Sequence, residues 1–362
     1  MLLRLLIGLL ALLTGGGNHH HRLRLLGPRP YEVWDGRVAG YAPAGVESVP
    51  VVFRGHRWRV PVAFDGSFDA VIANAPMGDG RLRVGGATIA PVYAVPAGSL
   101  RPLAAPENDP ALDRRLQALA RSADPDVAAE LRRPDGTAAA YNAGAEFEAA
   151  STLKLPSMLA ALAAIHGELT RSAYWEPFQE ITRYSDNAAE DELLDLLGGS
   201  ETGGATRMVA FVRLLGLRHT YMEGGYLTAA GVGGGPPPAT AVDPPPAAYK
   251  YTTADDMARL AAWLADAAAG SGPLIGRGVT EHEARELLYL MLHAEDPGLV
   301  EAGVHGLPVA HKIGWLDDSR DDVAIVFGPS GLTVVTVYCF GDIDDSAYGF
   351  GAAVARAATR GG

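Results

Sequence analysis

The spacing of apolar residues divides the chain into two parts. Within residues 28–95, apolar positions alternate with polar ones, as they do from Trp58 to Phe64, and this period of two predicts short half-buried strands. Asp65-Gly66 predicts a hairpin turn that joins this strand to the next. With turn residues at short intervals throughout, the pattern predicts a small all-β sandwich.

From residue 111 onward, the period changes to the three-to-four-residue repeat of amphipathic helices, with strand-like runs near both ends. Residues 96–110, rich in proline and alanine, predict a linker between the two parts. Thr253 and Asp256 predict a capping box at the start of one helix. The predicted strands are residues 127–132, 137–142, 309–313, 322–327 and 332–340, and the predicted helices include residues 111–121, 176–184, 188–197, 209–217, 253–268, 280–293 and 345–360.

The N-terminal residues have the pattern of a targeting signal. Arg4 is followed by an apolar run over residues 5–13, which is too short to span a bilayer comfortably and is typical of a secretory signal. Residues 1–27 are therefore predicted to be a signal peptide, and an uncleaved membrane anchor flanked by Arg22 and Arg24 is the alternative. Either predicts a secreted or cell-envelope protein, and the anchor would associate the chain with the envelope through this segment.

Composition excludes several partners and cofactors. The net charge of −12 argues against nucleic acid or an anionic membrane surface as the main partner. The single cysteine, Cys339, excludes an internal disulfide, and its apolar surroundings predict a buried thiol. His282 and His293 lack metal-ligand spacing, so neither a metal site nor another cofactor is expected.

The segment AASTLKLPSMLAALAAIHG places Ser151 and Lys154 three residues apart at the start of a predicted helix. Residues at this spacing share a helix face, roughly 5–6 Å apart at Cβ, and a neutral amine there can take the proton of a nucleophilic hydroxyl. Ser-x-x-Lys also arises by chance in a chain of this length. A capped helix with a solvent-facing lysine is therefore the structural alternative.

Two further motifs favour the catalytic interpretation. A Ser-Asp-Asn triplet begins at Ser185, and a Lys-Ile-Gly triplet begins at Lys312. Lysine occurs only at Lys154, Lys250 and Lys312, with arginine elsewhere, so two of the three lysines lie in these motifs. A buried amine whose pKa can be tuned is something that arginine cannot supply.

In kind and in order, these three motifs resemble those of class A β-lactamases and penicillin-binding proteins. The resemblance covers about residues 109–362 and implies a five-stranded antiparallel sheet flanked by helices. Only 34 residues separate Ser151 from Ser185, fewer than is usual in the family, which implies a reduced helical subdomain. The predicted fold class is therefore α+β and class A β-lactamase-like over residues 111–362, preceded by an all-β domain that resembles bacterial immunoglobulin-like modules in pattern.

The resemblance implies catalytic roles for three residues. Ser151 would attack an acyl carbonyl to form an acyl-enzyme. Lys154 would accept the proton of Ser151 and must be neutral to do so. Ser185 would relay that proton to the leaving nitrogen.

The resemblance also implies a substrate-binding set. Asn187 would hold the substrate's side-chain amide and orient Lys154. Lys312 would face the substrate's carboxylate, in the motif that continues through Gly314. The backbone N–H groups of Ser151 and Trp315 would bind the oxyanion.

The sequence departs from the family pattern in the groups that bind the carboxylate and activate water. Ile313 replaces a threonine whose hydroxyl helps to bind a β-lactam carboxylate. Tyr226 falls where the family carries its deacylating glutamate. Glu223 lies a few residues early and is either a substitute base or a solvent-facing loop carboxylate, and a Gly/Pro-rich insertion follows at residues 231–246. Acylation is thus expected to be intact, while deacylation is in doubt.

Three interpretations of function follow. The first is a class A β-lactamase-like serine hydrolase acting on β-lactams or related amides and esters. The second is a slow-turnover penicillin-binding or carboxypeptidase-like protein of the cell wall. The third is a non-catalytic surface binding protein that retains the fold. The partner expected for the first two is a small β-lactam or peptide-like substrate.

Overall fold

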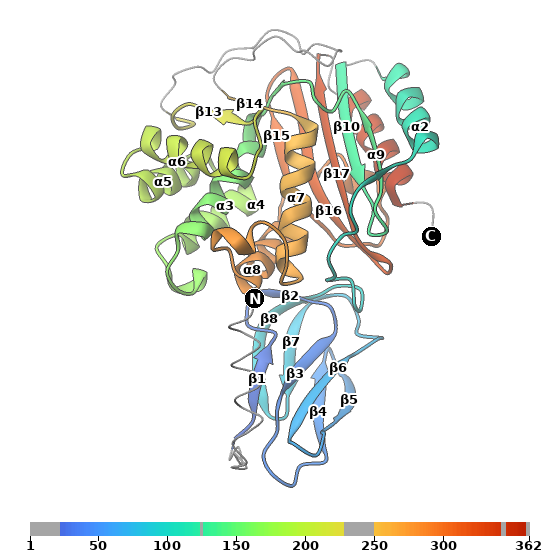
Figure 1. Cartoon of the computed structure of the whole chain (residues 1–362), viewed down its shortest axis with the longest axis vertical. Coiled ribbons are helices and arrows are strands. Elements are labelled where there is room, and N and C mark those ends of the chain that lie inside the picture. Colours follow the sequence, from blue (N-terminus) through green and yellow to red (C-terminus); the bar gives the residue numbers. More distant parts are fainter. Residues whose placement is uncertain (1–21, 124–125, 228–249, 342–344, 360–362) are drawn as a thin grey trace.

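The computed structural model describes residues 22–123, 126–227, 250–341 and 345–359. An all-β domain lies at one end of the molecule and an α+β domain at the other (Figure 1). The predicted signal falls largely on residues 1–21, outside the described residues. Arg24–Gly27 form strand β1 of the all-β domain, so this domain begins at Arg24 rather than at residue 28. Within the described ranges, no helix is long and apolar enough to cross a membrane.

The all-β domain consists of two sheets that share one apolar core around Trp34, Phe53 and Leu82. One sheet has the order β1-β3-β6 and the other the order β2-β8-β7-β4-β5. These strands are β2 (Glu32–Trp34), β3 (Arg37–Tyr41), β4 (Ser48–Phe53), β5 (His56–Pro61), β6 (Ser67–Val71), β7 (Gly78–Val84) and β8 (Ala87–Ala94).

The hairpin predicted at Asp65-Gly66 is wrong. β5 pairs with β4, whereas β6 pairs with β3 in the other sheet. The turn itself is present, because the Ser67 N–H and hydroxyl both donate to the Asp65 carboxylate. It carries the chain from one sheet to the other because Phe68 enters the shared core while Phe64 stays in solvent.

The α+β domain is built on a sheet with the order β15-β16-β17-β10-β11-β9. The five antiparallel strands are those that the sequence predicted, and the two-residue strand β9 adds a parallel edge from within the predicted linker. Buried apolar residues on both faces of β17 explain its unbroken hydrophobic sequence. The bounds are β9 (Glu107–Asn108), β10 (Asp126–Arg132), β11 (Thr137–Tyr141), β15 (Val309–Trp315), β16 (Ser319–Gly328) and β17 (Gly331–Phe340).

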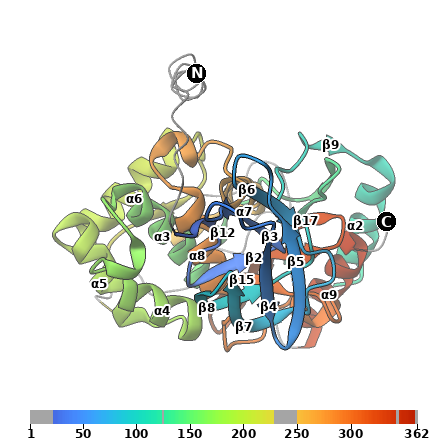
Figure 2. The same ribbon diagram turned by 90° about the horizontal axis from the view of Figure 1, so that it is seen from below.

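Helices cover both faces of this sheet. α2 and α9 pack on one face, and α7 lies on the other beside the helical subdomain of α3 to α6 (Figures 1 and 2). A small sheet of β12 (Phe147–Glu148), β14 (Lys250–Thr252) and β13 (Tyr221–Met222) borders that subdomain. The helices are α2 (Pro110–Arg121), α3 (Lys154–Ala164), α4 (Trp175–Tyr184), α5 (Asn187–Gly198), α6 (Glu201–Leu214), α7 (Ala254–Ala268), α8 (Glu281–Met291) and α9 (Asp345–Thr359).

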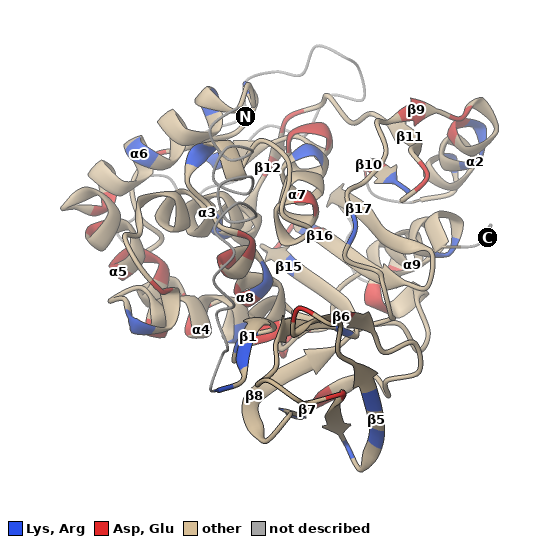
Figure 3. Ribbon diagram, turned by 60° about the horizontal axis from the view of Figure 1, so that its bottom comes forward, with Lys and Arg blue, Asp and Glu red and all other residues tan. Residues whose placement is uncertain are grey.

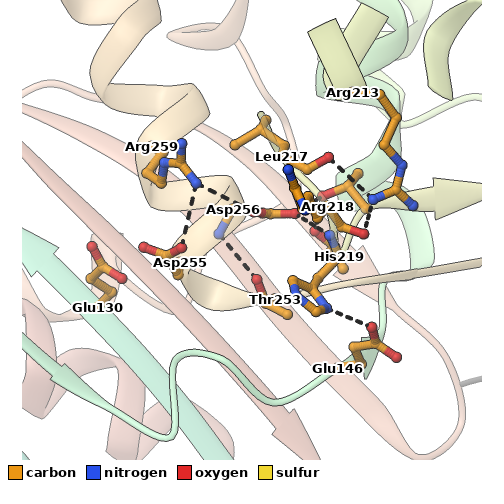
Figure 4. Close-up of polar contacts among 12 residues, drawn as sticks. Glu130, Glu146, Arg213, Leu217, Arg218, His219, Thr253, Asp255, Asp256 and Arg259 are labelled. Carbon is orange, nitrogen blue, oxygen red and sulfur yellow. Dashed lines mark hydrogen bonds and ion pairs between the residues drawn. The ribbon is translucent and has the colours of Figure 1, made fainter. Parts of the chain in front are cut away.

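The start of α7 fixes the loop that follows α6 (Figure 4). Thr253 caps the helix by accepting the Asp256 N–H at 3.1 Å. The Asp256 carboxylate does not complete the predicted capping box. It accepts instead the His219 N–H at 2.8 Å and the Thr220 hydroxyl at 2.9 Å, and so holds the loop against the helix.

The two domains meet through buried side chains. Glu32 of β2 is fully buried and lies 2.6 Å from Nδ1 of His282 on α8. The Tyr31 ring packs edge-on against Trp175 and Tyr289, with centroids 4.9 and 5.9 Å away. These contacts pack the all-β domain directly against the α+β domain. Figure 3 shows that basic and acidic segments are distributed over both domains.

This interface generates a pH prediction for Glu286. Burial, with the nearby carboxylates of Glu32 and Glu283, raises its pKa to about 8. Because the unfolded carboxyl titrates near pH 4.5, the folded state keeps a proton that the unfolded state loses, and stability falls as pH rises from 4.5 to 8. Glu286→Gln should leave the melting temperature nearly unchanged at pH 5 and raise it by about 2–4 °C at pH 8.

The matched control is Glu192→Gln, which makes the same change at an exposed helical position. It should shift the melting temperature at neither pH. Equal effects of Glu286→Gln at pH 5 and pH 8 would show that Glu286 is ionised in the folded protein.

Candidate active site

Ser151 lies in a single 3-10 turn, Ala150–Leu153, that runs directly into α3. Ala150 has a φ of +43°, a left-handed conformation that is costly for alanine and is typical of functional sites. Its carbonyl accepts a 2.8 Å hydrogen bond from the Tyr226 hydroxyl. A second hydrogen bond stabilises the turn, because the Thr152 hydroxyl donates to the Ala149 carbonyl at 2.5 Å.

Lys154, one turn after Ser151, is fully buried. Its Nζ donates to the Ser185 carbonyl at 2.5 Å and to Oδ1 of Asn187 at 2.6 Å. The Tyr226 ring covers the amine with its centroid 4.5 Å away. The alternative of a solvent-facing lysine is therefore wrong, and the predicted contact between Asn187 and Lys154 is present.

The Ser-Asp-Asn triplet is shaped by two helix ends. Ser185 closes α4 in a left-handed conformation with a φ of +55°. Asp186 then caps α5 by accepting the Ala189 N–H at 2.7 Å. Because the chain reverses at Ser185, its carbonyl points to Lys154 while its hydroxyl accepts a 2.7 Å hydrogen bond from Lys312.

Lys312 reaches this site from β15, the edge strand of the sheet. It is almost fully buried, and its Nζ also donates to the Ile313 carbonyl at 3.0 Å. Burial, together with the neighbouring Lys154, lowers the pKa of Lys312 to about 7. The structure thus directs Lys312 to the Ser185 hydroxyl, and its predicted contact with a substrate carboxylate stays a prediction.

Gly314 allows β15 to approach the turn that carries Ser151. A Cβ at Gly314 would lie 3.1 Å from the Ala149 carbonyl and from Cβ of Ala150, closer than is normal for side-chain contacts. Trp315 follows, with 66% of its surface exposed and the Arg320 guanidinium 4.9 Å from its ring. As an edge strand, β15 keeps backbone N–H and C=O groups on the side away from β16, as the predicted oxyanion site at Trp315 requires.

A buried carboxylate adjoins Lys154. Glu190 of α5 is fully buried, and neither of its carboxyl oxygens has a hydrogen-bond partner among the described residues. Burial raises the pKa of Glu190, while the charge of Lys154 opposes this. Burial also lowers the pKa of Lys154 against the attraction of Glu190, Asp186 and Asp191. Both effects favour a neutral Lys154 amine, the form that can accept a proton.

Comparison with known proteins identifies the family to which this chain belongs. The β-lactamase enzyme family matches residues 175–360, just over half of the chain. The chain belongs to the β-lactamase enzyme family. The match covers Ser185 and Lys312, and the Ser151–Lys154 turn precedes it. No curated protein matches the chain.

Solved structures show the same fold. A β-lactamase from Xanthomonas campestris pv. campestris is 20% identical with a TM-score of 0.54, over 68% of this chain and 96% of its own. PBP-A is 19% identical with a TM-score of 0.55, over 70% of this chain and 97% of its own. An ancestral class A β-lactamase is 20% identical with a TM-score of 0.53, over 68% and 98%. This β-lactamase family member therefore has the class A fold, preceded by an all-β domain.

In this β-lactamase family member, Tyr226 occupies the space beside Lys154. The Asp191 carboxylate holds it there by accepting the N–H groups of Tyr226 and Leu227 at 2.5 and 2.8 Å. Burial raises the pKa of the Tyr226 phenol well above its ordinary value, so the hydroxyl stays protonated. Glu223, the candidate base, is exposed, and within the described residues it makes no hydrogen bond or ion pair with Ser151 or Lys154.

Sequence reasoning missed Glu190 and Asp191, although both lie within one helical turn of Asn187. The sequence does contain a signal that could have identified Glu190. Glu190 continues the apolar stripe of α5 at the i and i+4 spacing to Leu194, and an acidic residue at a core-facing position indicates a perturbed site. Within the described residues, no group of three or more potential ligands could hold a metal ion.

The hydrogen bonds that the Asp191 carboxylate accepts from Tyr226 and Leu227 lead to a second prediction. Asp191→Ala removes the acceptor of the Tyr226 and Leu227 N–H groups, so hydrogen–deuterium exchange at these amides should rise at least about tenfold, the equivalent of roughly 1.4 kcal/mol of protection. Asp195→Ala makes the same change at an exposed position of the same helix and should leave both exchange rates unchanged. Equal exchange in the two variants would mean that the loop is held without Asp191.

Proposed function

We propose that this protein is a serine hydrolase that forms an acyl-enzyme on Ser151 with β-lactams or related amides and esters. One observation carries the proposal. The buried Lys154 amine, one turn from Ser151, is held by Ser185 and Asn187, while Lys312 holds the Ser185 hydroxyl. Three motifs far apart in the sequence thus converge on one network of proton-transfer groups.

The proposed acylation follows from this network. Neutral Lys154 takes the proton of the Ser151 hydroxyl as its oxygen bonds to the acyl carbon. The backbone N–H groups of Ser151 and Trp315 bind the oxygen of the tetrahedral intermediate. As the bond to the leaving nitrogen or oxygen breaks, the proton passes from Lys154 through the Ser185 hydroxyl to the leaving group. Lys312, which donates to that hydroxyl, keeps it aligned.

The position of Tyr226 is an argument for slow hydrolysis of the acyl-enzyme. It therefore favours the second candidate, a penicillin-binding or carboxypeptidase-like protein of the cell wall. A protonated phenol bonded to the Ala150 carbonyl cannot activate water as a carboxylate does. Glu223 is exposed, and no hydrogen bond or ion pair joins it to Ser151 in the part of the chain that the structure describes. We further propose an extracytoplasmic location on the basis of the apolar run at residues 5–13.

The nucleophile is tested by covalent labelling. A fluorescent penicillin should label the wild type at one site, and Ser151→Ala should abolish the label because the attacking oxygen is gone. Ser122→Ala, at an exposed serine at the end of α2, is the control and should label normally. An adduct of unchanged mass on Ser151→Ala would refute the assignment, and an unlabelled wild type would favour the non-catalytic binding protein.

Turnover gives a separate prediction. Nitrocefin should produce a burst equal to the enzyme concentration and then a slow steady state, and Glu223→Gln should leave both phases unchanged. Tyr226→Glu places a carboxylate at the covered face of Lys154 and should raise the steady state, by up to the roughly 10²–10⁴-fold that a general base contributes. Tyr226→Phe is the matched control and should keep the slow rate. Rapid wild-type turnover that Glu223→Gln abolishes would contradict this view of deacylation.

A further inference from the structure

The charge of the chain is divided unevenly between its two domains. Residues 22–95 contain nine arginines and six acidic residues, a net charge of +3. Residues 96–362 contain 20 basic and 36 acidic residues, a net charge of −16. The total of −12 therefore combines a basic all-β domain with a strongly acidic α+β domain. Such a difference in sign indicates that the basic part meets an anionic partner.

Four of the nine arginines project from the outer face of the five-stranded sheet. Arg57 and Arg59 lie on β5, Arg81 and Arg83 lie on β7, and all four are exposed. Between these strands lies β4, whose Val52 pairs with both Arg57 and Arg83. Residues two apart on a strand share a face, and neighbouring strands lie about 4.8 Å apart. The four side chains therefore leave one area of the sheet about 10 Å wide.

The folded chain does not neutralise these four arginines. One of them donates to a neutral serine hydroxyl, and none forms an ion pair within the described residues. The two acidic residues on the strands of this sheet face the other domain instead. Glu32 lies 2.6 Å from Nδ1 of His282, and Asp79 lies 3.0 Å from Nε2 of His293. The outer face is thus left with unbalanced positive charge.

Protection of a sheet edge does not account for this face. Charged residues on an edge strand discourage pairing with another chain, which would explain the arginines of β5. However, β7 lies inside the sheet between β8 and β4, so Arg81 and Arg83 protect no edge. Guanidinium groups bind phosphate oxygens through paired hydrogen bonds. The face is therefore suited to a surface that carries many phosphate groups.

The length of the N-terminal sequence indicates which such surface is within reach. β1 begins at Arg24, and ten residues separate it from the apolar run at residues 5–13. Ten residues span at most about 36 Å, whereas packed sheets lie only about 10 Å apart. An apolar run held in a bilayer would therefore keep the outer face within reach of lipid headgroups.

We propose that the outer face of the sheet β2-β8-β7-β4-β5 docks on an anionic lipid bilayer through Arg57, Arg59, Arg81 and Arg83. This inference goes beyond the proposed acyl-enzyme function and does not depend on it. The acidic α+β domain opposes such binding, which is why the charge of the whole chain argues against it. Salt screens charges that lie more than about 8–10 Å from the headgroups, so the attraction is local to the all-β domain.

The test follows sedimentation of the full chain with vesicles of phosphatidylcholine, either alone or with about 30% phosphatidylglycerol. The N-terminal apolar run acts on both kinds of vesicle, so the ratio of the two partition coefficients reports the charge-dependent part of binding. Each arginine near an anionic surface contributes about fivefold, so Arg57→Gln combined with Arg83→Gln should lower this ratio roughly 25-fold. High salt should bring the wild-type ratio close to that of the double variant.

The matched control is Arg114→Gln combined with Arg115→Gln, which removes the same charge from exposed positions of α2. It should leave the ratio unchanged. An equal ratio for the wild type and the double variant on the sheet would overturn the proposal. Wild-type binding to soluble polyphosphate without a preference for anionic vesicles would also overturn it, in favour of a phosphate polymer. So would oligomers that form without vesicles and disappear in the sheet variant, in favour of a second copy of this chain.

Discussion

The site depends on keeping the amine of Lys154 out of water. A fully buried amine is tolerated only where acceptors satisfy its N–H groups or where it loses its charge. The Ser185 carbonyl and the Asn187 amide provide the acceptors, and both are available because α4 ends in a left-handed residue immediately before α5 begins. The same reversal turns the Ser185 hydroxyl toward Lys312. Satisfying one buried amine therefore also sets the position of the second.

The surroundings of Lys154 are chemically asymmetric. On one side are polar groups, namely Ser185, Lys312 and the buried Glu190. On the other side, Tyr226 presents an aromatic face and a hydroxyl that stays protonated. The Asp191 carboxylate accepts the backbone N–H groups of Tyr226 and Leu227. The architecture thus surrounds Lys154 with polar groups on one side and an aromatic ring on the other, an arrangement that suits the proposed acylation better than the activation of water.

The sequence predicted much of the fold and most residues of the candidate site, for reasons that lie in particular positions. Ser151, Lys154, Ser185, Asn187 and Lys312 occur in short motifs whose spacing can be recognised without a structure. Glu190, Asp191 and Tyr226 could not be assigned in this way, because their roles come from the packing of α5 and the loop after β13 around Lys154. The exposure of Glu223 likewise depends on how that loop folds.

Two local features were predicted wrongly from the sequence because their conformation depends on packing. α6 begins at Glu201, eight residues before its predicted start, because Gly203 and Gly204 resemble helix breakers in sequence. In the structure, a methyl group on Gly204 would overlap the Leu194 carbonyl, so this glycine permits close packing of α5 on α6. The strands around Asp65-Gly66 have the local pattern of a hairpin, and only the burial of Phe68 on the second sheet separates them.

The segment between the two domains has the composition of a flexible joint but the contacts of a core element. Val95 and Ser99 are almost or fully buried, and the Leu103 N–H donates to the Asp266 carboxylate of α7 at 2.8 Å. Tyr31, which packs against Trp175 and Tyr289, adds to this attachment. Removal of the all-β domain would uncover these aromatic side chains, one of which begins α4, the helix that precedes Ser185. The boundary visible in the sequence therefore separates two architectures, while the contacts of the α+β domain continue across it.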